Sequence, residues 1–266
     1  MNPLNRDERL VRHGLDASSA DVVVALAGNP NVGKSTVFNA LTGLKQHTGN
    51  WPGKTVVRAE GSYSFNKRKY KVVDLPGTYS LLSASADEEV ARDFILFGRP
   101  DVTVVVVDAT RLERNMNLVL QVLEITEKVV VALNLMDEAR RHSITVDERS
   151  LMKELGVPVV PLVARSGEGV LALLQRIEEV ATGSFECRPR RVWTGSPKLR
   201  KAVDRVAEQL KQAYPTLPNE RWVALRLLEG DQRIAEAVRT GELGRIASPE
   251  GATVMKKGKE DARVVA

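Results

Sequence analysis

The sequence has one cysteine and three histidines among 266 residues. The single thiol, Cys187, excludes an intrachain disulfide and a paired-cysteine metal site, and three histidines disfavour a metal site built from His and Cys. No apolar run reaches the roughly 18 residues that a membrane helix needs. The N-terminus carries charge but no apolar segment, so we expect no signal peptide. The whole chain is 43% hydrophobic and 27% charged, which is typical of a globular protein.

The length predicts about two domains. The net charge of +5 permits contact with anions but identifies no partner. Between residues 22 and 182, short β-branched runs alternate with amphipathic segments. This alternation predicts an α/β fold, with a mostly parallel sheet flanked by helices. The expected strands are 22–27, 70–73, 102–107, 128–133 and 157–163, and the expected helices are 35–44, 87–97, 112–126, 146–155 and 169–180. Residues 55–65 are expected to form a hairpin with 70–73 at a sheet edge.

The pattern changes on both sides of this region. Residues 1–21 are polar and aperiodic, and we interpret them as a mobile lead-in. Residues 183–196 are rich in Gly, Ser, Pro and Arg, which is typical of a linker. Residues 197–240 have helical periodicity and predict a small all-helical domain, with capping residues at Ser196, Asn219 and Asp231. Residues 241–266 form a polar tail that we expect to be disordered.

A complete G-x-x-x-x-G-K-[ST] motif spans residues 28–35, between the first expected strand and the first expected helix. Such a loop turns its N–H groups toward phosphates at a helix N-terminus, where the helix dipole favours anions. Lys34 is expected to contact the β- and γ-phosphates, and the Ser35 hydroxyl to bind Mg²⁺. The nucleotide-binding residues predicted here are Gly28, Asn29, Pro30, Asn31, Val32, Gly33, Lys34, Ser35 and Thr36.

A second motif, Asp74, Leu75, Pro76 and Gly77, follows the strand at 70–73. An acidic residue at this place is the second Mg²⁺ partner of phosphate-loop proteins. Gly77 has no Cβ, so its N–H group can approach a γ-phosphate closely. In isolation the tetrad could be a turn, but after a phosphate loop and one hairpin it favours nucleotide binding.

The N-x-x-D sequence Asn134, Leu135, Met136 and Asp137 ends the strand at 128–133. An aspartate carboxylate can accept two hydrogen bonds from guanine, whereas adenine offers no such donor pair, so the motif predicts guanine selectivity. The alternative is that Asn134 and Asp137 only cap a helix. Leu135 occupies the position of the usual lysine.

A last loop contains Val163, Ala164 and Arg165, where guanine-binding proteins usually have Ser-Ala-Lys. The Ala164 N–H group is expected to reach guanine O6. Val163 lacks the supporting hydroxyl, so we expect this loop to be looser.

The first switch is expected within residues 46–55. Its predicted nucleotide-contacting residues are Gly53, Lys54 and Thr55, with Thr55 closing over Mg²⁺. The Trp51-Pro52-Gly53 segment is interpreted either as a hydrophobic plug or as a docking surface.

Together, GNPNVGKST, GNWPGKTV, DLPGTYSL and NLMD resemble the N-terminal cytosolic region of the ferrous iron transport protein B (FeoB) family, over residues 22–240. The resemblance implies a Ras-like GTPase domain (G domain) at 22–182 that hydrolyses GTP to GDP with Mg²⁺. It also implies a helical domain that slows nucleotide loss and relays switch movement to a membrane-spanning portion of the same transporter. The place of action would be the cytoplasmic face of the cell membrane, where the switch gates Fe²⁺ uptake. Lys54, where an apolar residue is usual, and Val163 depart from the family pattern.

The same resemblance bears on catalysis, for which Lys34, Thr55, Gly77 and Asn31 are the candidate residues. Thr78 stands where a water-orienting glutamine is usual, which predicts slow intrinsic hydrolysis. Asn31 matches an asparagine that binds K⁺ in related GTPases, and carbonyl groups near residues 51–53 would complete that site; the alternative is that Asn31 only braces the loop. Glu88 and Glu89 are candidates to orient water, although Ser85 and Glu88 also form a capping box.

Two alternatives of other classes stay open. One is an RNA- or ribosome-associated assembly GTPase with a basic C-terminal module, for which Arg188, Arg190 and Arg191 would supply charge. The other is a regulatory module that binds nucleotide without hydrolysing it. The main interpretation expects no nucleic acid partner and no direct iron site, because no His, Cys and carboxylate cluster has metal-ligand spacing. A homo-oligomer stays open.

Overall fold

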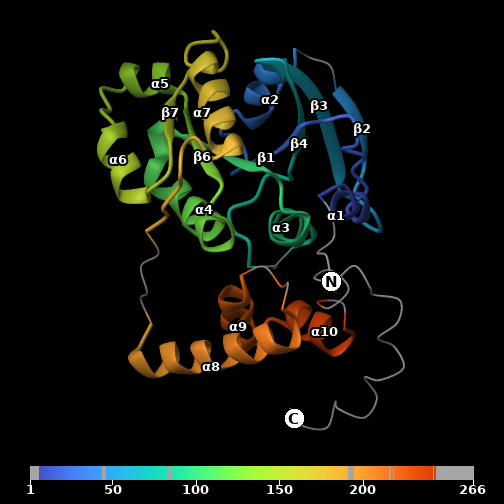
Figure 1. Ribbon diagram of the computed structural model, residues 1–266. Helices are drawn as coiled ribbons and strands as arrows, with labels where there is room; N and C mark the ends of the chain where they lie inside the picture. Colours follow the sequence, from blue (N-terminus) through green and yellow to red (C-terminus); the bar gives the residue numbers. More distant parts are fainter. Residues whose placement is uncertain are drawn as a thin grey trace. The chain divides into compact units, whose positions relative to one another are not determined.

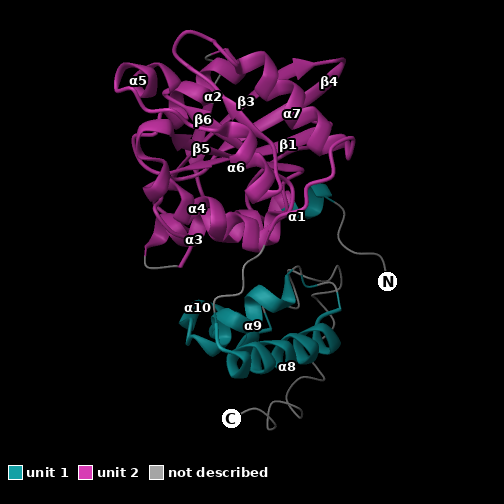
Figure 2. Ribbon diagram, turned by 90° about the vertical axis from the view of Figure 1, so that its left-hand side faces the viewer, with its two compact units in different colours: residues 1–9, 194–266 teal, residues 10–193 magenta. Residues whose placement is uncertain are grey.

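The computed structural model describes residues 6–43, 46–82, 85–190, 195–215, 217, 219–241 and 243. The chain divides into two compact units (Figure 2). Residues 10–193 form the larger unit, and residues 1–9 with 194–266 form the smaller one. Each unit is described separately below.

A seven-stranded sheet forms the centre of the larger unit, with strand order β2-β3-β4-β1-β5-β6-β7 (Figure 1). The pairs β1·β4, β1·β5, β5·β6 and β6·β7 are parallel, whereas β2·β3 and β3·β4 are antiparallel. The strands are β1 Val22–Gly28, β2 Gln46–Asn50, β3 Val57–Phe65, β4 Arg68–Asp74, β5 Val102–Asp108, β6 Val129–Asn134 and β7 Val159–Pro161. The mostly parallel α/β sheet that the sequence predicts is therefore confirmed.

Helices cover both faces of this sheet, α2 and α7 on one and α3 and α4 on the other (Figure 1). Alternate strand residues such as Val24, Val104 and Val130 pack against Phe38 of α2 and Ile177 of α7. The helical elements are α2 Lys34–Thr42, α3 Ala86–Asp93, the π-helix η1 Phe94–Gly98, the 3₁₀-helix η2 Ala109–Arg111, α4 Leu112–Ile125, α5 Met136–Arg141, α6 Glu148–Leu155 and α7 Val170–Thr182. Because β1, β5 and β6 are buried on both faces, their sequences are almost continuously apolar.

Two features differ from the sequence-based expectation. The hairpin of β3 and β4 forms, but β3 is not an edge strand, because β2 pairs with its outer side. The sequence of β2, QHTGN, is neither apolar nor alternating, so it gave no strand signal. Within the lead-in, residues 6–12 form helix α1 (Arg6–Arg12), and Leu10, Leu15 and Ala17 are fully buried. Their spacing follows neither a helix nor a strand period, which is why the sequence showed no element there.

The first residues of the predicted linker pack against the larger unit. Phe185 and Cys187 pack against the core of the larger unit, and the Arg188 N–H group donates to the Gly156 carbonyl at 2.8 Å. Gly156 has φ +72°, and a Cβ there would lie 1.9 Å from the Arg188 oxygen, so the segment fits only over glycine. Residues 191–194 lie outside the described part of the chain.

The smaller unit contains α8 Pro197–Ala213, α9 Glu220–Leu228 and α10 Gln232–Arg239, as the sequence predicts. The Ser196 and Asp231 side chains cap α8 and α10 by accepting from the N–H groups of Leu199 and Ile234. Asn219 was wrongly predicted as a side-chain cap, because it adopts φ +53° and its amide forms no capping bond. Apart from residues 241 and 243, the predicted tail at 241–266 lies outside the described residues. Of the helices that the structure describes, none has the length and apolar character to cross a membrane.

Candidate functional site

The phosphate loop links the carboxyl end of β1 to the N-terminus of α2. Gly33 precedes α2 with φ +81°, and a Cβ there would lie 2.4 Å from Nδ2 of Asn134, so this position excludes any side chain. No side chain caps α2. The first N–H groups of a helix have no partner within it, so those of α2 are available to an anion.

The acidic motif lies beside this loop because β1 and β4 are parallel neighbours. The Leu75 N–H group donates to the Leu26 carbonyl at 2.9 Å, and the Thr78 N–H group donates to the Gly28 carbonyl at 3.2 Å. A Cβ on Gly77 would lie 3.5 Å from Cα of Pro30. The structure thus brings residues 74–77 to the phosphate loop, as the motif spacing suggests.

Lys34 and Asp74 form an ion pair at the centre of this arrangement. Their side chains are 11% and 18% exposed, so the pair lies largely out of water. Burial raises the pKa of the Asp74 carboxyl above its ordinary value, and the neighbouring Lys34 ammonium opposes that rise. Lys34 and Asp74 are the residues predicted to meet phosphate and Mg²⁺, and here they neutralise one another.

Asn134 connects the phosphate loop to the last loop. Its Nδ2 donates to the Val32 carbonyl at 2.9 Å, and its Oδ1 accepts from the Ala164 N–H group at 3.1 Å. The side chain is buried, so both hydrogen bonds are shielded from water. The loops predicted to hold phosphate and base are therefore fixed to one amide.

Asp137 lies in the first turn of helix α5 and presents an unsatisfied acceptor. Its Oδ1 is buried and has no hydrogen-bond partner among the residues that the structure describes, while Oδ2 lies 3.7 Å from Nη2 of Arg141. Leu135, just before α5, adopts the left-handed conformation with φ +62°. An unpaired buried carboxylate oxygen costs free energy, which a donor pair on a ligand would recover.

The last loop differs from the expectation in two respects. The Ala164 N–H group, expected to reach guanine O6, donates to Asn134 instead. The loop is also not loose, because Val163 pairs with Glu168 and the Ser166 hydroxyl donates to the Val163 carbonyl at 3.2 Å. Arg140 of α5 forms an ion pair with Glu168, which ties the base motif to this loop. Sequence reasoning missed that pair, since 28 residues separate its members.

The first switch forms β2 and a tight loop before β3. Trp51 is 3% exposed and packs edge-to-face on Phe94 of η1 with ring centroids 5.2 Å apart, which favours the hydrophobic plug over the docking surface. The Trp51 carbonyl, near the predicted K⁺ site, accepts from the Lys54 N–H group at 3.0 Å. Thr55 is exposed in this loop, and the structure does not bring it into hydrogen-bond contact with Ser35 or Asp74.

The candidates for orienting water have other partners. The buried Thr78 hydroxyl donates to the Ser80 carbonyl at 2.6 Å. The Glu88 N–H group donates to Ser85, as the capping box predicts. Glu89 forms an ion pair with Lys54 at 2.9 Å, which joins the first switch to α3 and which no sequence signal indicated.

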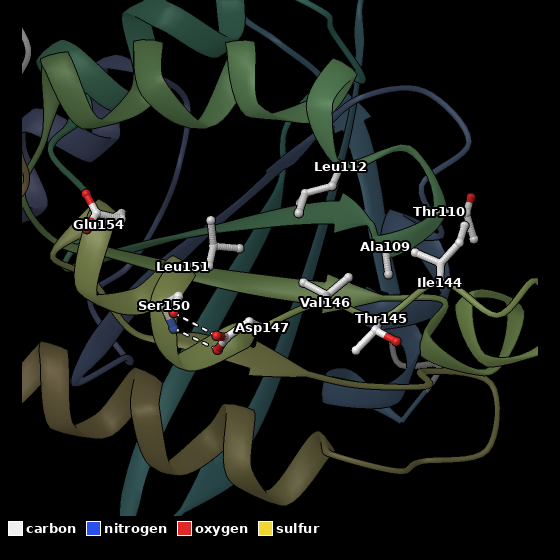
Figure 3. A pocket seen from close by; sticks show the side chains of 10 residues that line it. All are labelled: Ala109, Thr110, Leu112, Ile144, Thr145, Val146, Asp147, Ser150, Leu151 and Glu154. Carbon is white, nitrogen blue, oxygen red and sulfur yellow. Dashed lines mark hydrogen bonds between the residues drawn. The ribbon is translucent and has the colours of Figure 1, made fainter.

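The basic cluster and one groove lie apart from this site. Arg188 and Arg190 pair with Glu186 and Glu154, and Arg191 lies outside the described residues. A groove of about 460 Å³ between η2 and α6 contains Leu112, Val146 and Leu151, and the Asp147 carboxylate there accepts from Ser150 (Figure 3). None of its lining residues belongs to the predicted nucleotide site.

Known proteins resemble this chain over both units. The family described as Ferrous iron transport protein B matches residues 22–177, and the FeoB cytosolic helical domain matches residues 196–265. The Fe(2+) transporter FeoB of Salmonella typhimurium is 43% identical over 79% of this chain, which spans only 27% of that relative's length.

Solved structures give the same result. The cytosolic domain of the T. maritima FeoB iron transporter in its GDP form I is 38% identical, with TM-score 0.75 over 84% of this chain and 85% of that one. The FeoB G-domain from Methanococcus jannaschii is 47% identical, with TM-score 0.54 over 60% of this chain and 97% of that one.

Proposed function

Because the chain belongs to the family of ferrous iron transport protein B, we propose that residues 22–182 bind guanine nucleotides and hydrolyse GTP to GDP and phosphate. The observation that carries the proposal is the Asn134 bridge, which fixes the phosphate loop and the base loop to one buried amide. The unpaired Oδ1 of Asp137 supports guanine as the base. The similar T. maritima domain is described in a GDP form.

The residues around the phosphate loop fit a magnesium site. Ser35 offers a hydroxyl and Asp74 a carboxylate, which are the oxygen ligands that Mg²⁺ prefers, and Thr55 would join them when the switch closes. Bound phosphates would attract the Lys34 ammonium and so release Asp74 from their ion pair. When bound, Mg²⁺ neutralises charge that develops on the phosphates.

A potassium ion is the proposed activator. Asn31, with φ +65° at the exposed edge of the phosphate loop, would supply its amide oxygen, and carbonyl groups of the loop at 51–53 would complete the site. The Trp51 carbonyl is engaged by Lys54 in this conformation, so that loop would have to rearrange. When bound, K⁺ supplies positive charge beside the phosphates.

Catalysis would then rest on positioning and electrostatics. Lys34 and the α2 amides hold the phosphates, and the Gly77 N–H group meets the γ-phosphate. Thr78 is buried in its turn and carries no amide with which to orient water, so we expect slow intrinsic turnover.

For the whole protein, we propose that this region acts at the cytoplasmic face of the cell membrane and gates Fe²⁺ uptake through a membrane-spanning portion. The helical unit would relay the state of the switches to that portion. Iron would be the cargo of the membrane-spanning portion, and we assign no iron ligand to this chain. The match of residues 196–265 to the FeoB helical domain favours this function over an RNA-associated GTPase.

Turnover assays with GTP and with ATP, in KCl and in NaCl with Mg²⁺, test the proposal. We expect multiple turnovers of GTP, little hydrolysis of ATP and a higher rate in KCl. Binding without turnover in either salt would instead support the non-hydrolysing module. In vesicles that hold the full-length transporter, Fe²⁺ uptake that is insensitive to GTP would contradict the gating role.

A further inference from the structure

Residues 10–17 precede the family match, which begins at residue 22. They nevertheless belong to the compact larger unit. The side chains of Leu10, Leu15 and Ala17 are fully buried. The Leu15 N–H group donates back to the Leu10 carbonyl at 2.9 Å and closes the end of α1, with Gly14 at φ +74°. A helix end of this kind, with a left-handed glycine and buried apolar neighbours, fixes the chain direction that follows.

This segment contacts the first switch directly. The His13 carbonyl accepts from Nη1 of Arg58 at 3.0 Å, and the same guanidinium lies over the Trp51 ring, 5.5 Å from its centroid. A Cβ on Gly14 would lie 2.6 Å from Nη1 of Arg58 and 2.7 Å from Cγ of Pro52. The backbone of residues 13–14 therefore packs against both ends of the loop that contains Thr55.

The segment also contacts the π-helix η1. The His13 ring packs edge-to-face on Phe94 with centroids 5.8 Å apart, and Phe94 in turn contacts Trp51. A Cβ on Gly98 would lie 3.5 Å from Cδ2 of His13, so the histidine fits closely against η1. His13, Trp51 and Phe94 thus join the N-terminal segment, the switch loop and η1 in one aromatic cluster.

We propose that residues 10–17 are an intramolecular latch that holds the loop at 51–56 against η1 and opposes its closure over nucleotide. The latch regulates the site assigned above, so this proposal rests on the proposed function. Thr55 must leave its exposed position to meet Mg²⁺, and movement of the loop strains the contacts of Pro52 and Arg58 with Gly14. A contact made in only one of two conformations shifts the equilibrium toward that conformation.

The substitution Gly14→Ala tests the latch, because its methyl group would collide with Arg58 and Pro52. The matched control is Gly183→Ala at the end of α7, where φ is +76° and a Cβ would meet nothing within 4 Å. Both substitutions carry the same left-handed backbone penalty, so only the collision differs. Arg58→Gln, which removes the guanidinium that donates to His13, is a second variant should Gly14→Ala fail to fold.

The first readout is amide exchange of Trp51 and Lys54 in the nucleotide-free protein, since their N–H groups close the switch loop. We expect exchange at least about tenfold faster in Gly14→Ala than in Gly183→Ala. Equal exchange in the two variants would overturn the latch whatever the nucleotide results are.

The second readout is the ratio of affinities for a non-hydrolysable GTP analogue and for GDP. Gly14→Ala should raise this ratio about fivefold or more, and Gly183→Ala should leave it at the wild-type value. An unchanged ratio in Gly14→Ala would overturn the latch. If the wild-type protein binds no guanine nucleotide, the proposed function fails and the latch fails with it.

Discussion

Nδ2 of Asn134 donates a hydrogen bond of 2.9 Å to the carbonyl oxygen of Val32 in the phosphate loop. The same side chain accepts from Ala164, so one buried amide sets the distance between the two ends of the proposed nucleotide site. Affinity for a ligand that spans both ends depends on this fixed spacing, because a preorganised site loses less entropy on binding.

Replacing Asn134 with alanine should therefore weaken both the fold and nucleotide binding. The change leaves the Val32 carbonyl and the Ala164 N–H group without their partner, which should lower the free energy of unfolding by about 2 kcal/mol or more. Urea unfolding and GDP titration measure the two effects. The control Asn117→Ala removes an exposed amide that donates to the Tyr79 carbonyl, and it should change either quantity little. Equal effects of the two substitutions would contradict the bridging role.

The Asp74→Asn substitution should reduce GTP turnover at limiting Mg²⁺ by about tenfold or more, because an amide binds the ion less well than a carboxylate. A Mg²⁺ titration of the turnover rate measures this. Asp147→Asn, in the separate groove of Figure 3, should leave the titration unchanged. If both variants keep the wild-type Mg²⁺ dependence, Asp74 is not a magnesium partner.

Asn31→Gly should abolish the response to K⁺. Glycine accepts the φ of +65° without strain, so this change removes the amide oxygen without adding a left-handed penalty. The wild-type rate should be about tenfold or more higher in KCl than in NaCl, and the variant should show equal rates. Equal wild-type rates in the two salts would contradict the potassium site.

His13 should make stability depend on pH. Burial, with a smaller contribution from Arg12, lowers the pKa of His13 to about 4 from 6.5, so the unfolded chain takes up this proton more readily than the folded one. The neutral His13 side chain makes its full contribution to the free energy of unfolding above pH 6.5, and this contribution is lost as the pH falls toward 4. Between pH 7 and pH 5 the free energy of unfolding should fall by about 2 kcal/mol. Urea unfolding at both pH values should show that His13→Gln lacks this loss and that a variant of the exposed His142, His142→Gln, retains it. Identical pH dependence in the two variants would contradict the assignment.

The parts of the fold that sequence could predict are those with a strong local signal. The strands β1, β5 and β6 are buried on both faces, so each forms a continuous apolar run. The motifs at residues 28–35 and 134–137 follow two of these strands, and residues 74–77 follow β4, which is the parallel neighbour of β1. Parallel strands place their carboxyl ends at the same edge of the sheet. Their proximity thus follows from topology.

The parts that sequence could not predict depend on tertiary partners. Strand β2 is defined by its pairing with β3 and not by its own composition. The pairs Lys54–Glu89 and Arg140–Glu168 join residues distant in sequence, and no periodicity indicates them. The sequence predicts that the Ala164 N–H group contacts a ligand, but in the structure this group donates to the buried side chain of Asn134.

Competition against labelled GDP measures whether the proposed base site selects guanine through Asp137. We expect the wild-type protein to prefer GDP over ADP by about a hundredfold or more, and Asp137→Asn to lose this preference. Glu138→Gln, on the adjacent carboxylate of α5, should retain it. Equal competition by ADP and GDP in the wild-type protein, or an unchanged preference in Asp137→Asn, would show that Asp137 does not select guanine.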